Sequence, residues 1–159
     1  MKKLWINNNT LVTADNKVVE CDDCPCSNIF TISAGGDCSC GGRSGLSLGV
    51  LDGNYRLTYL SGAVCTQSGQ MWNHIYTATR ICMPGGAHAI YIGRGNYNGV
   101  LAPGFSTAGY ASANSAELAY KDTYIDYSFD GSANIIMWYD DDVCGDNIGS
   151  IAYSLEKLS

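Results

Sequence analysis

The sequence predicts an all-β protein whose strands form a β-sandwich, and three observations support this prediction. Glycine is frequent at 19 of 159 residues and tyrosine at 11, whereas proline is rare at 3, a composition typical of strands separated by turns. Short segments alternate apolar and polar residues with the period of two that a half-buried strand requires. Turn signals separate these segments at the spacing of a sandwich. The length fits one domain plus a small appendage.

The composition also narrows the class of function. A hydrophobic fraction of 46% with 15% charged residues indicates a globular protein. The net charge of −6, with nine scattered Lys and Arg residues, argues against a nucleic-acid partner, because phosphate binding requires a basic surface. No apolar run reaches membrane-spanning length, and residues 1–10 lack the apolar core of a signal peptide. We therefore expect a chain made in the cytoplasm without a signal peptide.

The first 45 residues are expected to form a small segment of their own. Residues 4–6 and 11–12 lead to a turn at Asp15-Asn16 and residues 17–19 return, which predicts a hairpin over residues 1–20. Residues 29–32 predict one short strand, and the glycines of 41–45 predict a flexible connection. We place a boundary near residue 45, which separates an N-terminal hairpin and Cys-rich adaptor (1–45) from a β-sandwich (46–159).

Eight cysteines are unusual in a protein made in the cytoplasm. They indicate metal binding, or disulfides that form once the protein reaches an oxidising medium. Five of them cluster early, at Cys21, Cys24, Cys26, Cys38 and Cys40. Their spacings fit four thiolates on one Zn²⁺ or a set of disulfides, and either arrangement leaves one cysteine over.

The strands of the sandwich follow in order. Residues 46–50 predict a strand that ends at the turn signal of residues 52–54. The next strand, residues 55–59, places Tyr55, Leu57 and Tyr59 on its core face. A long loop of small residues is expected at 61–70, followed by strands near 72–82 and 88–92.

The second half of the sandwich is less regular. Residues 112–120 allow either a short helix or an extended edge. Residues 124–129 predict a strand with Ile125, Tyr127 and Phe129 inward, and residues 130–132 turn the chain into a strand at 135–139. A turn at Gly149-Ser150 precedes the last strand, residues 151–155.

Residues 140–147, which we name the acidic loop, connect these last two strands. The loop holds four carboxylates and an amide, from Asp140, Asp141, Asp142, Asp146 and Asn147. Carboxylates this close repel one another unless a cation lies among them, and oxygen ligands in an irregular loop favour Ca²⁺ over Mg²⁺. The alternative is a solvated acidic turn, since Asp, Asn and Gly are common turn residues.

The sequence contains no evident catalytic arrangement. His74 and His88 are the only two histidines, and neither lies in a Gly-x-Ser-x-Gly elbow or near a plausible activated cysteine. The carboxylates of the acidic loop crowd one segment, whereas the paired carboxylates of a glycan hydrolase flank a cleft from separate strands. We therefore expect a non-enzymatic protein.

Residues 46–159 resemble the calcium-dependent galactose-binding lectins of bacteria, the galactophilic lectin A type. The resemblance rests on the acidic loop with the following Ile148-Gly149-Ser150, and on an early motif, Leu57-Thr-Tyr-Leu-Ser-Gly-Ala-Val-Cys-Thr66-Gln67. It implies a jelly-roll-like β-sandwich that holds one Ca²⁺ between these two segments. It also implies a saccharide, galactoside-like or a host surface glycan, that binds the metal through two hydroxyls.

The resemblance implies specific site residues. The implied metal ligands are the side chains of Asp140, Asp146 and Asn147 and the carbonyls of Thr66 and of Val143 or Cys144. The loop is one residue shorter than the family pattern, which leaves Asp141 as a rival to Asp140. The candidate saccharide contacts are Gln67, Gln70, Trp72, His74, Asp140 and Asn147.

Two further expectations concern the surroundings of this site. Cys65 and Cys144 fall in the two metal loops, so a disulfide between them would hold the site together; the alternative is two small buried thiols. Trp72 or Tyr139 is expected to stack against the sugar, and because Trp138 and Tyr139 alternate, one of them is expected to lie in the core.

Residues 1–45 have no counterpart in the lectins and are similar to N-terminal adaptors of bacteriophage virion proteins. This similarity implies a virion or other extracellular setting, with copies displayed as a homo-oligomer or on a larger particle through residues 1–45. Display in many copies multiplies weak single-site binding. The alternative function is a structural or decoration protein of a virion or filament, in which calcium only rigidifies a loop or subunit contact.

Overall fold

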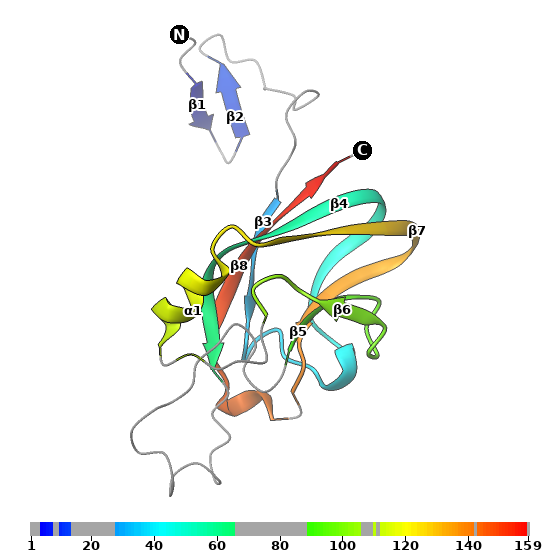
Figure 1. Cartoon of the computed structure of the whole chain (residues 1–159). Coiled ribbons are helices and arrows are strands. Elements are labelled where there is room, and N and C mark those ends of the chain that lie inside the picture. The colour runs from blue at the N-terminus through cyan, green and yellow to red at the C-terminus, as the bar shows by residue number, and fades with distance from the viewer. Residues whose placement is uncertain are drawn as a thin grey trace, which may run out of the picture.

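The computed structural model describes residues 4–7, 10–13, 28–65, 89–105, 110, 112–141 and 143–158. These residues form a mostly β structure with one six-stranded antiparallel sheet, a two-stranded sheet and one α-helix (Figure 1). The strand order of the large sheet is β3-β8-β4-β7-β5-β6. None of the described helices is long and apolar enough to cross a membrane.

The strands of the large sheet occur largely where the sequence predicts them. Their bounds are β3 (Asn28–Ser33), β4 (Leu46–Cys65), β5 (Ile90–Gly93), β6 (Gly99–Leu101), β7 (Tyr124–Tyr139) and β8 (Ile148–Lys157). Two 3-10 turns, η1 (Cys40–Gly42) and η2 (Cys144–Asp146), lie in the connections. Because β3 belongs to this sheet, the boundary expected near residue 45 does not separate it from the later strands. The strand predicted at 72–82 lies outside the described residues.

β4 and β7 form a long two-stranded ribbon that bends sharply along its length (Figure 1). The pairing shifts register between Val50 and Asp52, beside Gly131, whose φ of 68° favours glycine. The turns predicted at residues 52–54 and 130–132 are therefore wrong, because the chain bulges and bends there but stays in the sheet. Glycine is common both in hairpin turns and in β-bulges, so its presence in the sequence does not distinguish the two.

Two other expected interruptions are also part of strands. Residues 61–65 of the expected long loop continue β4, and the turn expected at Gly149-Ser150 lies inside β8. Gly62 and Gly149 both have a positive φ, of 95° and 91°. A Cβ at either position would collide with the backbone of the opposite strand, so these glycines permit close strand pairing rather than a turn.

The bend lets the sheet bury its own concave face. β8 pairs with the second half of β4, whereas β5 pairs with the end of β7. Tyr139 N donates to Asp37 O and Ser39 N donates to Tyr139 O, each at 2.9 Å, so the segment after β3 joins the end of β7. The described strands β3 to β8 thus form one continuous, curled sheet.

The core lies between the two halves of this sheet. Ile32, Leu57, Met137 and Ile151 are fully buried there. As predicted, Leu57 and Tyr59 are buried and Tyr55 packs against the core. Tyr127 and Phe129 also pack against it, but Ile125 stays 37% exposed, so its predicted burial is wrong.

Residues 112–120 adopt the helical alternative. α1 (Ala113–Tyr120) begins after Ser112, whose Oγ accepts a hydrogen bond from Ser115 N at 3.2 Å and caps the helix. Gly62 N of β4 donates to Glu117 Oε1 at 2.8 Å. The helix is thus fixed against the second half of β4.

The N-terminal hairpin is confirmed, but its strands differ from those predicted. β1 (Leu4–Asn7) pairs antiparallel with β2 (Thr10–Thr13), so the second strand of the hairpin comes earlier than the predicted return at residues 17–19. The turn predicted at Asp15-Asn16 and that return lie outside the described residues. The Asn-rich run of residues 7–9 carries turn chemistry of its own, which explains the shorter hairpin.

Buried tyrosines are expected to make the fold sensitive to alkali. Burial raises the pKa of Tyr59 to about 12 and the pKa of Tyr153 well above its ordinary 10.0. The folded state therefore keeps both phenols protonated after the unfolded chain has begun to ionise. Stability should be unaffected below pH 10 and should fall as the pH rises toward 12. Urea unfolding between pH 7 and 11.5, followed by circular dichroism, measures this loss.

Tyr153→Phe is the matched variant. The Tyr153 hydroxyl is buried and has no hydrogen-bond partner within the described chain, so its removal should cost little at pH 7. The variant should lose less stability than the wild type at high pH. An equal loss in both proteins would show that Tyr153 does not contribute.

Candidate metal centre

The acidic loop lies at one end of the curled sheet, between the end of β7 at Tyr139 and the start of β8 at Ile148. Cys65, the last residue of β4, pairs with Ile148, so the chain leaves β4 beside the acidic loop. Ala34 N donates to Gly149 O at 3.0 Å, which adds the turn after β3 to the same end. Three connections therefore meet where the sequence places the metal.

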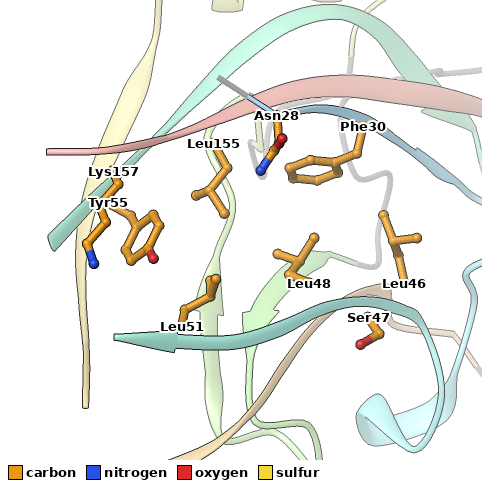
Figure 2. Close-up of a pocket in the computed structure, with 9 residues that line it drawn as sticks. All are labelled: Asn28, Phe30, Leu46, Ser47, Leu48, Leu51, Tyr55, Leu155 and Lys157. Carbon is orange, nitrogen blue, oxygen red and sulfur yellow. The ribbon is translucent and has the colours of Figure 1, made fainter. Parts of the chain in front are cut away.

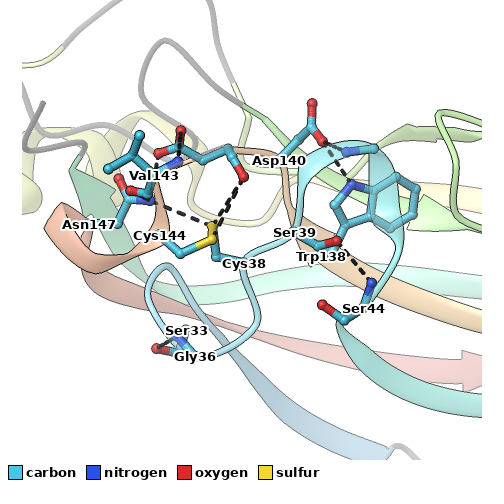
Figure 3. Close-up of a disulfide and its surroundings, with 12 residues drawn as sticks. Ser33, Gly36, Cys38, Ser39, Ser44, Trp138, Asp140, Val143, Cys144 and Asn147 are labelled. Carbon is cyan, nitrogen blue, oxygen red and sulfur yellow. Dashed lines mark hydrogen bonds between the residues drawn. A yellow bond between two sulfur atoms is a disulfide. The ribbon is translucent and has the colours of Figure 1, made fainter.

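A disulfide between Cys38 and Cys144 joins the segment after β3 to the acidic loop (Figure 3). Their Cα atoms are 5.5 Å apart. The expected Cys65–Cys144 disulfide is therefore wrong. Tyr139 anchors residues 37–39 by two backbone hydrogen bonds, and this places Cys38 next to η2. The sulfurs lie 3.6 and 3.7 Å from the Asp141 carbonyl oxygen, as contacts only, because a disulfide has no S–H to donate.

The N-terminal zinc hypothesis loses one of its ligands in this arrangement. Cys38 is not available as a thiolate beside Cys40, which is exposed and lies 3.8 Å from the Tyr97 hydroxyl. The other three candidates, Cys21, Cys24 and Cys26, lie outside the described residues.

Asp141 organises the interior of the acidic loop. It is 5% exposed, and its carboxylate accepts hydrogen bonds from Asn147 Nδ2 at 2.7 Å and from Val143 N at 3.1 Å (Figure 3). Asn147 is 8% exposed, and its Nδ2 also lies 3.5 Å from Val143 O. Because the Asn147 amide nitrogen faces Asp141, its carbonyl oxygen is directed elsewhere.

Two oxygen atoms of this loop are buried without a hydrogen-bond partner in the described part of the chain. They are Asp146 Oδ1 and Asn147 Oδ1, on adjacent residues. Buried polar atoms are nearly always paired in folded proteins, and a missing partner often marks an ion or a water.

Asp140 belongs to a different group of residues. Its Oδ1 accepts hydrogen bonds from Gly41 N at 2.7 Å and from Trp138 Nε1 at 3.3 Å. Its charge also helps, after the Cys40 thiol, to raise the pKa of Tyr97. The structure thus brings Asp141, Val143 and Asn147 together and places Asp140 beside η1.

Both aromatic residues that precede the loop are buried. Trp138 and Tyr139 are each 0% exposed. Tyr139 belongs to the core cluster, as expected for one of the two, so it is not accessible for stacking on a ligand. The remaining sequence-predicted residues, Thr66, Gln67, Gln70, Trp72 and His74, lie outside the described residues, as does Asp142.

The donor set fits a hard cation only in part. Among the described residues, no three His, Cys, Asp or Glu side chains gather closely enough to hold a metal. The loop itself offers two carboxylates, one amide oxygen and backbone carbonyls, which is oxygen chemistry suited to Ca²⁺ rather than to a softer metal.

Cys38 is the residue of this site that sequence reasoning missed. The spacing of the sequence groups Cys38 with its neighbour Cys40, although five early cysteines leave one over. That odd count is the signal that one of them pairs with a distant cysteine.

Comparisons of the chain with protein-family models, with curated proteins and with solved structures found no match in any of the three.

Proposed function

We propose that this protein is a non-enzymatic binding module that takes up Ca²⁺ at the acidic loop and binds a saccharide there. Asp146 and Asn147 would supply the side-chain oxygens and loop carbonyls the rest, while Asp141 would orient the Asn147 amide. The proposal does not require the complete jelly roll of the galactophilic lectins. It requires only an antiparallel sheet with an acidic loop between two of its strands.

The two unpaired oxygens, Asp146 Oδ1 and Asn147 Oδ1, carry this proposal. Leaving a buried polar atom unpaired costs about 1–3 kcal/mol, and more when the group is charged. A bound cation removes that cost at both atoms at once. A solvated acidic turn, by contrast, would leave these oxygens in contact with water.

The hydrogen bonds within the loop prepare it for a cation. Asn147 Nδ2 binds the Asp141 carboxylate at 2.7 Å, which fixes the amide with its oxygen free. Val143 N holds the other Asp141 oxygen at 3.1 Å, and the Cys38–Cys144 disulfide limits the movement of the loop. Such restraint lowers the entropy cost of ordering the ligands.

Bound Ca²⁺ takes six to eight oxygen ligands, so a loop that fills only part of this shell leaves positions for vicinal hydroxyls. The saccharide itself is suggested by the resemblance of the acidic loop to the galactose-binding lectins. Display of many copies on a virion, through the N-terminal segment, would multiply weak single-site binding.

One observation favours the alternative of a structural or decoration protein. Val143 lies within the loop and Ile148 directly follows it, and they are 55% and 43% exposed. Apolar side chains beside a metal loop also suit a subunit contact that calcium would rigidify. The two functions make different predictions for stability. A saccharide should add to the stabilisation by calcium if the protein binds sugars, and should add nothing if the loop forms a subunit contact.

Calcium is expected to raise the melting temperature of the wild-type chain. At a free concentration of 100 times Kd, the stabilisation is about 2.7 kcal/mol, or roughly 5–11 °C for a chain of this size. A galactoside added after calcium should raise it again. Differential scanning fluorimetry with Ca²⁺, with Mg²⁺ and with EDTA measures both steps.

Asp146→Asn and Asn147→Ala should each remove most of the calcium response. Asp122→Asn, an exposed residue whose φ of 64° suits asparagine equally well, removes the same charge as Asp146→Asn and should keep the full response. A calcium shift without any response across a glycan array would support the structural alternative. No calcium shift in the wild type would refute both.

A further inference from the structure

A groove opens between the two halves of the curled sheet, at the end where β3 begins. Its volume is about 430 Å³, and most of its lining is apolar. Figure 2 shows the side chains that line it, which come from β3, β4 and β8: Asn28, Phe30, Leu46, Ser47, Leu48, Leu51, Tyr55, Leu155 and Lys157. Four of these residues also pack against the hydrophobic core: Phe30, Leu46, Leu48 and Tyr55. The groove is therefore the place where the core is open to solvent.

Among the described elements, β1 and β2 are in extensive contact only with each other. Two strands of four residues each are marginally stable in water unless they pack against something else. The alternation in its sequence gives no polar face, because Leu4 and Ile6 belong to one alternating set and Trp5 to the other, and Leu11 and Val12 likewise differ. The hairpin therefore requires an apolar partner.

The chain itself connects this hairpin to the groove. Residue 28, where β3 starts, is part of the groove lining. Only residues 14–27 separate it from the end of β2, and fourteen residues reach at most about 50 Å. A tether of this length holds the hairpin near the groove at an effective concentration on the order of millimolar.

The charges of the connection and the groove are complementary. Residues 14–27 contain Asp15, Glu20, Asp22 and Asp23 against Lys17 alone, a net charge of −4 + 1 = −3. Lys157 is exposed at the groove, with its Nζ 5.8 Å from the centre of the Tyr55 ring. Opposite charges attract, so the acidic composition of residues 14–27 suits a groove that carries a lysine.

We propose that the groove formed by Phe30, Leu46, Leu48, Leu51, Tyr55 and Leu155 is the docking site of the β1–β2 hairpin of the same chain. Docking covers the open mouth of the core and gives the hairpin the apolar surface that it lacks. The hairpin then adds a second layer over one end of the sheet.

Binding of the dye ANS to the full chain tests the proposal, because this dye reports exposed apolar surface. The wild type should bind little dye. Trp5→Ser combined with Val12→Ser should raise ANS fluorescence several-fold and shift the methyl resonances of Leu46, Leu48 and Leu155. Asn9→Ser, in the connection between β1 and β2, should change neither. Equal dye binding by the wild type and the double variant would overturn the proposal.

A groove variant gives the reciprocal test. In a Trp72→Phe background, Leu48→Lys should shift the emission of Trp5 to the red while the buried Trp138 is unaffected. Val100→Lys, at a 52% exposed position of β6 outside the groove, is the control and should leave the emission unchanged. If dye binding rises on dilution and the wild type elutes as a dimer, the groove is covered by a second copy, and docking within one chain is refuted.

Discussion

Replacing Cys38 and Cys144 together by serine is expected to lower the free energy of unfolding by about 4–5 kcal/mol. The disulfide spans a sequence separation of 106 residues, and closing a loop of about 100 residues in the unfolded chain corresponds to roughly 4.7 kcal/mol in the chain-entropy model. It also joins the two connections that meet at the acidic loop. Urea unfolding of oxidised wild type, reduced wild type and the double variant measures the difference.

Cys40→Ser is the matched control for this prediction. Cys40 lies two residues from Cys38 but is an exposed free thiol, so its replacement should change stability by less than about 0.5 kcal/mol. Reduced wild type and the double variant should unfold at the same urea concentration. A loss of similar size in Cys40→Ser would mean that Cys40 takes part in the disulfide.

Trp138→Ala is expected to cost about 3–5 kcal/mol, the usual loss when a buried tryptophan is truncated. Trp138 is 0% exposed and stacks on Tyr91, with ring centroids 5.4 Å apart and planes at 24°. A Cβ added at Gly42 or at Gly99 would lie 2.7 Å from its ring, so backbone from η1 and from β6 contacts the indole directly. Removing the ring leaves a cavity that these segments cannot fill.

Chemical denaturation with Leu118→Ala as control checks this effect. Leu118 is 68% exposed on α1, so it loses little buried surface when truncated and should cost less than about 0.5 kcal/mol. Trp138→Phe keeps an aromatic ring between Gly42 and Gly99 and should lower the free energy of unfolding less than Trp138→Ala does. If Trp138→Ala and Leu118→Ala unfold alike, the loop of residues 40–45 does not depend on the indole.

The strands could be predicted from the sequence because their alternation is local. Leu57 and Tyr59 in β4 and the run of β7 and β8 all show the period of a half-buried strand. The bends could not be predicted, because Gly53 and Gly131 carry the same signal whether the chain reverses or merely bulges. Only the partner strand distinguishes the two.

The place of the acidic loop in the fold could be predicted from the sequence, but the contacts within the loop could not. The acidic loop does lie where β4 ends, yet sequence spacing cannot show which way neighbouring carboxylates point. The carboxylates of the adjacent residues Asp140 and Asp141 point to different neighbours. Asp140 accepts hydrogen bonds from Gly41 and Trp138. Asp141 accepts them from Asn147 and Val143. The flexible connection predicted from the glycines of residues 41–45 differs for a related reason. Gly42 and Gly45 pack closely on Trp138, and close packing requires glycine as much as flexibility does.

The place of β3 in the sheet decides how this protein can be divided. A fragment that starts at residue 46 would expose the whole length of β8 as a bare strand edge, which is a template for aggregation. It would also lack Cys38 and so leave Cys144 without its disulfide partner in the acidic loop. The shortest piece worth expressing therefore starts no later than residue 28, and any gene fusion that contains this sheet has to keep β3.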